Sequence, residues 1–349
     1  MVSELRAMNS ITLAPSNIED LYDISYIRKR MLDYGDVIRV FLDNNILTRV
    51  LNLPIEGKGK SRKLSEEEKS VCVLMGYFVY CGHLTIPDIS MYESMSTPTP
   101  ESRVKTEHIF RYFDHLNPQI YLDLARERIN SIPIKEWNSV KNEVKNNEVT
   151  QNNIKNNSYS ESSDPQKAFY LSLLKAWLIY KQTKDFESGF ETLVDWIYEN
   201  SIIDQNSVLF YIHLFKRNRL SSLIKKINSN IPDVIFKNIS NTAWDLAHLN
   251  YFIVASQKYY KEGAICFCSR DRLCHELMRI SLSFRAEADF TRYLTENYSK
   301  KHASLISQLS SRHNNRSNVP AHVKSVVDNL DDRISDMEKE ITRYLEEVE

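Results

Sequence analysis

Glycine is scarce in this chain, with only 7 residues among 349. Turns, bulges and phosphate-binding loops depend on glycine, because it adopts left-handed backbone angles without strain. No Gly-rich dinucleotide-binding or P-loop pattern occurs. Long apolar runs are missing too, since none reaches the roughly 18 residues that a membrane span needs. These absences favour a helix-rich protein without common nucleotide-binding loops, and we expect no membrane contact.

An excess of one charge sign is also absent, because 45 basic and 46 acidic residues give a net charge of −1. Overall charge therefore does not draw the protein to nucleic acid, and any site for a polyanion must be a local basic patch. Hydrophobic residues make up 42% of the chain, enough to bury a core. The length suits two or three domains.

Cysteine is infrequent and odd in number, and the five residues are Cys72, Cys81, Cys266, Cys268 and Cys274. An odd count without a signal peptide predicts reduced thiols in a cytoplasmic protein. Three of these cysteines, with His275, invite a zinc interpretation. Buried thiols are favoured instead, because the C-x-C pair falls on an apolar strand and no second ligand pair has the usual spacing.

Apolar periodicity and helix caps predict strands and helices of an α/β core in residues 1–100 and 236–285. Ser65, followed by three glutamates, predicts the start of a helix that Gly82 ends. Asn241 and Thr242 predict another helix start. The expected strands cover 37–42, 83–86 and 264–268. The expected helices cover 45–53, 65–81 and 241–260, and a further helix begins at residue 89.

These patterns divide the chain into four parts. Strand and helix patterns occur in residues 1–100 and 236–285, and residues 101–235 between them are mainly helical. Within 101–235, the Asn-rich segment at about 140–164 predicts a disordered linker, because it has almost no core-forming side chains. Residues 286–349 are expected to be helical.

The C-terminal segment 323–348 has a seven-residue apolar repeat. One position holds Val327, Ile334, Ile341 and Val348, and the other holds Val323, Leu330, Met337 and Tyr344. β-Branched residues at one position and mostly Leu-like residues at the other suit a two-stranded coiled coil. The repeat predicts either a homodimer through this helix or packing against its own domain.

Four acids lie at the ends of expected strands or near the starts of helices: Asp43, Glu93, Asp245 and Asp271. Acids in such positions converge on one crevice of an α/β sheet. Clustered carboxylates raise each other's pKa unless a cation neutralises them, and Mg²⁺ or Mn²⁺ prefers such oxygen ligands. A site of this kind suits phosphodiester hydrolysis.

Four segments containing these acids resemble the motifs of PIN-domain ribonucleases, in the same order. They are 41–47 (FLDNNIL), 86–93 (IPDISMYE), 242–249 (TAWDLAHL) and 266–271 (CFCSRD). The resemblance implies a PIN-like α/β/α sandwich with a short parallel sheet and a divalent-metal endoribonuclease. It also implies that the four acids bind metal, and that Asn45 and Ser269 orient ligands or the scissile phosphate.

The resemblance has one departure. Glu93 and Asp245 are about 150 residues apart, far more than the family normally has, so the helices between them must be an insertion. If Glu93 is not the second acid, Asp88 is the next candidate, although it also suits a helix cap.

The expected function is hydrolysis of RNA by a Mg²⁺- or Mn²⁺-dependent endoribonuclease, in a toxin-like or antiviral role that a regulatory protein partner would restrain. Whether DNA is also cut stays open. Two basic clusters are candidates for contacts with the phosphate backbone. They are Lys58, Lys60, Arg62 and Lys63 on a loop, and Arg217 and Arg219 with neighbouring lysines on an expected helix.

Two other interpretations compete. HEPN ribonucleases use Arg and His four to six residues apart on a helix, and Arg103 with His108 or Arg270 with His275 fits that spacing. Alternatively, the chain is a non-catalytic helical scaffold with a degenerate PIN-like core. A scaffold has no reason to bring several acids within one metal shell.

Overall fold

The computed structural model describes most of the chain, in several ranges. They are 2–8, 10–13, 22–59, 62–94, 99–156, 164–183, 185–200, 228–259, 261–271 and 329–348, with residues 211, 275, 278, 292, 293, 295, 296, 300, 301 and 304. Lys60, Arg217, Arg219, Cys274 and residues 157–163 and 321–328 lie outside this description. The chain folds as two compact units, 1–160 with 248–282 and 161–247 with 283–349.

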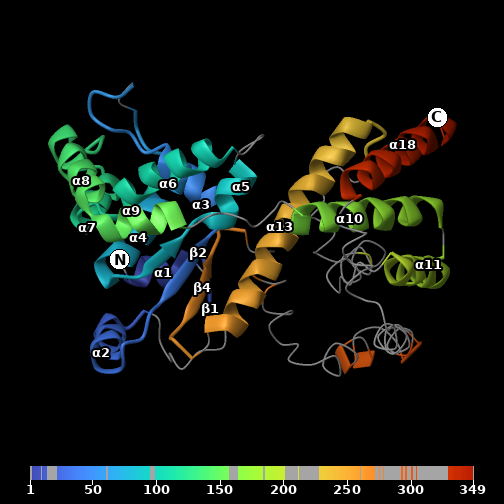
Figure 1. Cartoon of the computed structure of the whole chain (residues 1–349), viewed down its shortest axis with the longest axis horizontal. Coiled ribbons are helices and arrows are strands. Elements are labelled where there is room, and N and C mark those ends of the chain that lie inside the picture. The colour runs from blue at the N-terminus through green and yellow to red at the C-terminus, as the bar shows by residue number, and fades with distance from the viewer. Residues whose placement is uncertain are drawn as a thin grey trace. The chain divides into compact units, whose positions relative to one another are not determined.

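The fold is α/β, with many helices around one small mixed sheet (Figure 1). The strands are β1 (Ile11–Leu13), β2 (Arg39–Leu42), β3 (Leu84–Ile86) and β4 (Ile265–Cys268), in the order β1-β4-β2-β3. β4, β2 and β3 are parallel, and β1 runs antiparallel to β4 at the edge. Because Leu42 pairs in register with Cys268, the residues that follow β2 and β4 lie side by side at the carboxyl ends of these two parallel strands.

Nine helices of the described chain precede residue 160 in the first unit. They are α1 (Val2–Met8), α2 (Ile24–Tyr34), α3 (Asn44–Leu51), α4 (Glu66–Cys81), α5 (Asp88–Ser94), α6 (Pro100–Asp114), α7 (Pro118–Ala125), α8 (Ile134–Asn146) and α9 (Glu148–Asn156). The expected start and end of α4 are confirmed: Ser65 and Glu68 form a capping box, and Gly82 is left-handed. α4 is buried on nearly all sides, so it forms the centre of the core.

The Asn-rich segment differs from the expected linker over its first part. Residues 140–156 are almost entirely helical, in α8 and α9. Val140, Val144 and Ile154 are buried, and these few apolar side chains suffice to anchor both helices. The helices of 101–156 therefore belong to the first compact unit, together with the sheet.

The second unit contains α10 (Asp164–Gln182), α11 (Phe186–Glu199) and α18 (Leu330–Val348). The apolar repeat of α18 packs against α10, and Leu330, Met337 and Ile341 are buried there. Tyr170 Oη donates a hydrogen bond to Glu338 at 2.6 Å and fixes the pair. The surface that suggested a homodimer is thus used within the chain.

Helix α13 (Pro232–Tyr259) contributes residues to both units. It begins about ten residues before the expected cap at Asn241 and Thr242. Thr242 is inside the helix, where its Oγ1 donates to the carbonyl of Asn238 at 3.1 Å. Pro232 at the first helical position is the start signal, because proline needs no hydrogen-bond partner there.

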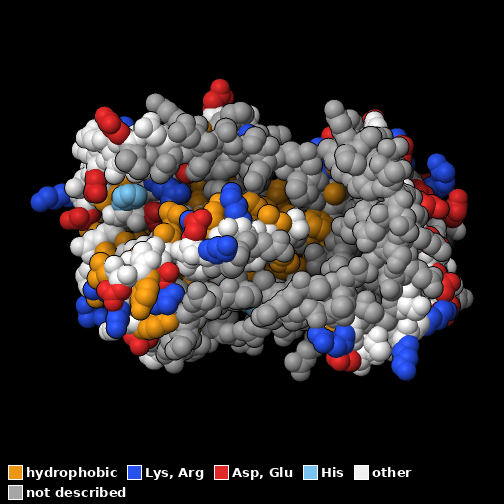
Figure 2. Space-filling model, turned by 60° about the horizontal axis from the view of Figure 1, so that its bottom comes forward, with side chains coloured by type: hydrophobic (Ala, Val, Ile, Leu, Met, Phe, Trp, Pro, Cys, Tyr) orange, Lys and Arg blue, Asp and Glu red, His pale blue; other side chains and the backbone are white. Residues whose placement is uncertain are grey.

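No helix in the described ranges is long and apolar enough to cross a membrane. Several large apolar side chains nevertheless stay exposed, including Leu32, Tyr34 and Val254. Figure 2 shows one face on which apolar side chains gather between Lys or Arg and Asp or Glu side chains. Apolar side chains at the surface are normal for a folded protein.

Candidate metal centre

Asp43 follows β2 directly and is buried, with 3% of its surface exposed. It occupies the N-cap position of α3, but its side chain makes no cap hydrogen bond. Instead, its Oδ2 accepts hydrogen bonds from Ser269 Oγ at 2.7 Å and Asn45 Nδ2 at 3.1 Å. Its backbone N–H donates to the carbonyl of Cys268 at 2.9 Å. The carboxylate is therefore held in place by β2, β4 and α3, and helix capping does not explain it.

Glu93 and His248 come from α5 and α13 and lie beside Asp43. His248 Nε2 and Glu93 Oε2 are 2.8 Å apart. Ser90, one turn before Glu93, donates from Oγ to the carbonyl of Leu42 and so fastens α5 to the end of β2. The His248 ring packs against Phe267 of β4, with 6.2 Å between ring centroids. Two helices thus bring one acid and one imidazole to the same edge of the sheet.

These three side chains have the geometry of a ligand set. One ligand atom from each of Asp43, Glu93 and His248 lies within 4.8 Å of the other two. Ligands bound to one ion at about 2.1 Å lie at most about 4.2 Å apart, so a small adjustment suffices. Two carboxylates and an imidazole suit a divalent cation.

The other two predicted acids are not in this group. Asp245 lies one helical turn before His248 on α13 and belongs to the second unit. Asp271 is exposed, and its backbone N–H donates to Ser269 Oγ at 2.9 Å. Asp88 begins α5, about one and a half turns before Glu93. Metal binding by Asp245 or Asp271 stays a prediction.

Sequence reasoning gave His248 no role. It lies on an apolar helix, where a histidine is usually a core residue. The signal was its position three residues after Asp245, within the segment TAWDLAHL that already resembled a nuclease motif. Residues three apart share one helix face, so either could point toward the sheet.

Asn45 and Ser269, the two predicted supporting residues, both donate to the Asp43 carboxylate. Ser269 is held in turn by His275, whose Nε2 lies 2.8 Å from the Ser269 carbonyl. His275 Nδ1 is hydrogen-bonded to Thr12 Oγ1 of β1. Both ring nitrogens of His275 are engaged within the protein, so the ring serves to position Ser269, and this weakens the HEPN interpretation for Arg270 and His275.

The zinc interpretation gains no support from the described cysteines. Cys266 and Cys268 are completely buried in β4. Burial raises the pKa of both thiols, and for Cys268 the nearby negative charge of Asp43 raises it further. Zinc binds the thiolate form, so these side chains act as core thiols.

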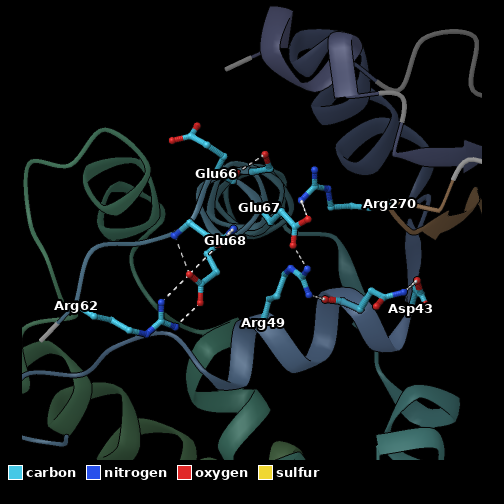
Figure 3. A network of polar contacts seen from close by, with 10 residues as sticks. Asp43, Arg49, Arg62, Glu66, Glu67, Glu68 and Arg270 are labelled. Atoms are coloured by element: carbon cyan, nitrogen blue, oxygen red, sulfur yellow. Dashed lines mark hydrogen bonds and ion pairs between the residues drawn. The ribbon is translucent and has the colours of Figure 1, made fainter. Parts of the chain in front are cut away.

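The predicted basic loop is largely paired within the protein. Arg62 donates to both carboxylate oxygens of Glu68 (Figure 3). This guanidinium lowers the pKa of Glu68 to about 2. Lys63 forms an ion pair with Glu127 at 3.2 Å, and Lys58 lies over the ring of Trp137.

Two other arginines lie nearer to Asp43. Arg49 of α3 donates to the carbonyl of Asn45 at 3.4 Å, and Arg270 follows Ser269 directly. Glu67 of α4 pairs with both, and it is 4.0 Å from Arg270 (Figure 3). All three side chains are partly exposed, so they form an accessible polar network beside the candidate metal centre.

Comparison with protein-family models finds no match to this chain. Neither curated proteins nor solved structures give a match. Evidence for the function therefore comes from the site itself.

Proposed function

We propose that the first unit is a PIN-like nuclease core and that the protein hydrolyses RNA with the help of Mn²⁺ or Mg²⁺. One observation carries this proposal: Asp43, Glu93 and His248 bring three ligand atoms within 4.8 Å of one another. The group lies where parallel strands end, which is the usual place for chemistry in an α/β fold. A scaffold would not need this convergence.

Under this proposal the residues of the site have three different roles. Asp43, Glu93 and His248 would hold the cation, which polarises a phosphodiester and activates water when bound. Ser269 and Asn45 hold the Asp43 carboxylate in its orientation. Arg49 and Arg270 would contact neighbouring phosphates, because guanidinium groups pair with phosphate oxygens. Glu67 would release them as RNA enters.

The test is cleavage of labelled single-stranded RNA, and of DNA of the same sequence, by the full chain with Mn²⁺, Mg²⁺ or EDTA. Asp43→Asn and His248→Asn should each lower the cleavage rate by about 100-fold or more, because each removes a ligand. Asp33→Asn is the matched control, since Asp33 is exposed on α2 away from the group. It should cleave like the wild type.

Binding is measured separately, by titrating Mn²⁺ and following its electron paramagnetic resonance signal. His248→Asn should bind Mn²⁺ more weakly than wild type, whereas Asp271→Asn should not. Loss of binding in Asp271→Asn alone would favour the four acids of the sequence motifs instead. Equal RNA cleavage by wild type and Asp43→Asn would reject the nuclease, and inactivity of both would favour the scaffold.

A further inference from the structure

A groove on the first unit has no role in the proposed chemistry. It lies between α6 and α8, with contributions from α9 and the 55–58 turn, and has a volume of about 910 Å³. Its floor is apolar and includes Ile55, Val104 and Ile109. Trp137 and Lys145 lie eight residues apart on α8, so the groove extends about 12 Å along this helix. That length matches about two turns of an added helix.

The rim of the groove is positively charged. Lys58, Lys105, Lys141 and Lys145 line it, and Glu101 is the one acidic residue among its lining residues. Within the described chain, no ion pair joins Lys105, Lys141 or Lys145 to an acid, whereas Lys63 and Lys69 both pair with Glu127. A surface of four lysines around apolar side chains is complementary to an acidic, apolar partner.

Two buried polar atoms of the groove lack hydrogen-bond partners in the part of the chain described. They are Nε1 of Trp137 and Nδ1 of His108. Trp137 is only 3% exposed, and its N–H can act only as a donor. An unpaired buried polar group costs free energy. An occupant that offers acceptor atoms would remove this cost.

We infer that this groove binds a short amphipathic helix of a protein partner, whose leucine-like side chains fill the apolar floor and whose Glu or Asp side chains meet Lys105, Lys141 and Lys145. Binding of this kind uses apolar residues at i, i+3 or i+4 and i+7. The partner helix would lie along α6 and α8.

RNA fits the groove less well than an acidic helix does. Proteins hold single strands by stacking bases on open aromatic faces. Here the aromatic side chains of the groove are covered: Tyr112 is 8% exposed, and Lys58 lies over the Trp137 ring at 5.1 Å from its centroid. A small molecule fits poorly too, because the groove is open along its length and would not enclose it.

The experiment uses the full chain and a fluorescein-labelled peptide of about 12 residues, with Leu at helical spacing and Glu on both flanks. Fluorescence anisotropy should give a dissociation constant about tenfold or more below that of a scrambled peptide. Lys141→Glu with Lys145→Glu should weaken binding about tenfold or more through like-charge repulsion. Lys135→Glu is the matched control on the same helix, since Lys135 is exposed and outside the groove.

A charge-swapped peptide, with Lys in place of Glu, keeps the test independent of folding. It should bind the Lys141→Glu, Lys145→Glu double variant more tightly than it binds wild type. Equal binding of the designed and scrambled peptides would overturn the inference. Equal weakening of peptide binding by Lys135→Glu would also overturn it. The same holds if a single-stranded RNA of about 12 nucleotides binds more tightly than the designed peptide and the double variant abolishes that binding.

Discussion

His83 links the acid stability of the protein to one buried ring. It is 5% exposed between α4 and β3 and packs against Tyr77 and Phe78. Neither ring nitrogen has a hydrogen-bond partner among the described residues. Burial lowers the pKa of His83 from 6.5 to about 4, because the charged ring would lose its hydration. The folded protein therefore holds this ring neutral, which makes stability depend on pH.

The direction of that dependence follows from proton binding. Below pH 6.5 the unfolded chain takes up a proton at His83, and the folded chain does so only near pH 4. Stability is therefore lost as pH falls through this window, by about 2 kcal/mol between pH 7.5 and 5. Urea unfolding at these two pH values should show this loss in wild type and a loss smaller by about that amount in His83→Phe. An equal loss in the two would mean that His83 is not the group that titrates.

At the scale of single residues, sequence was a good guide to Asp43 and a poor guide to His248. Asp43 was visible because a carboxylate interrupts an apolar pattern. His248 lies between Ala247 and Leu249 on an apolar helix, so the sequence pattern does not distinguish it from a core histidine. Only the packing of α13 against Phe267 turns its ring toward Glu93.

At the scale of elements, Gly263 controls how β4 joins the sheet. Its φ is +142°, and an added Cβ would lie 2.2 Å from the carbonyl oxygen of Val37. The Val37 N–H donates to the carbonyl of Glu262 at 2.9 Å, so the segments around Val37 and Gly263 cannot separate without losing this hydrogen bond. The close approach sets the register that brings Ser269 to Asp43.

Gly263→Ala should therefore lower the free energy of unfolding by about 2–4 kcal/mol. Gly35→Ala is a matched control: its φ is +67°, but nothing lies within 4 Å of the added Cβ, so only backbone strain of about 1 kcal/mol applies. Urea unfolding of the two variants measures the difference. Similar losses in both would show that the approach to Val37 does not constrain the fold.

The elements that sequence predicted well have strong local signals. Ser65, the three glutamates after it and Gly82 marked both ends of α4. The composition of about 140–164 predicts a linker, because the segment is Asn-rich and has almost no core-forming side chains. The helices over 140–156 depend on Val140, Val144 and Ile154, which gain stability only by packing on other helices. Such tertiary burial is not contained in local composition.

At the scale of the whole molecule, the expected division of the chain did not anticipate the two units. The sequence patterns place the helices of 101–156 in an insertion, whereas in the structure they belong to the same compact unit as the sheet, and α13 contributes residues to both units. Periodicity indicates that a helix has an apolar face, but it does not say which partner covers that face. The heptad pattern of α18 presents the same ambiguity, and the oligomeric state depends on it.

We expect the full chain to be a monomer, because α18 already buries its apolar stripe on α10. Ile341 is 0% exposed, whereas Ile334, at the same heptad position one repeat earlier, is only half-buried. Ile341→Glu should therefore cost about 3 kcal/mol or more in urea unfolding, and Ile334→Glu clearly less. Light scattering at increasing protein concentration should give the mass of one chain, 40.9 kDa. In a coiled-coil dimer both substitutions would be equally disruptive. A measured mass of two chains would therefore contradict the packing of α18 within its own chain, if Ile334→Glu reduced it to the mass of one chain without unfolding the protein.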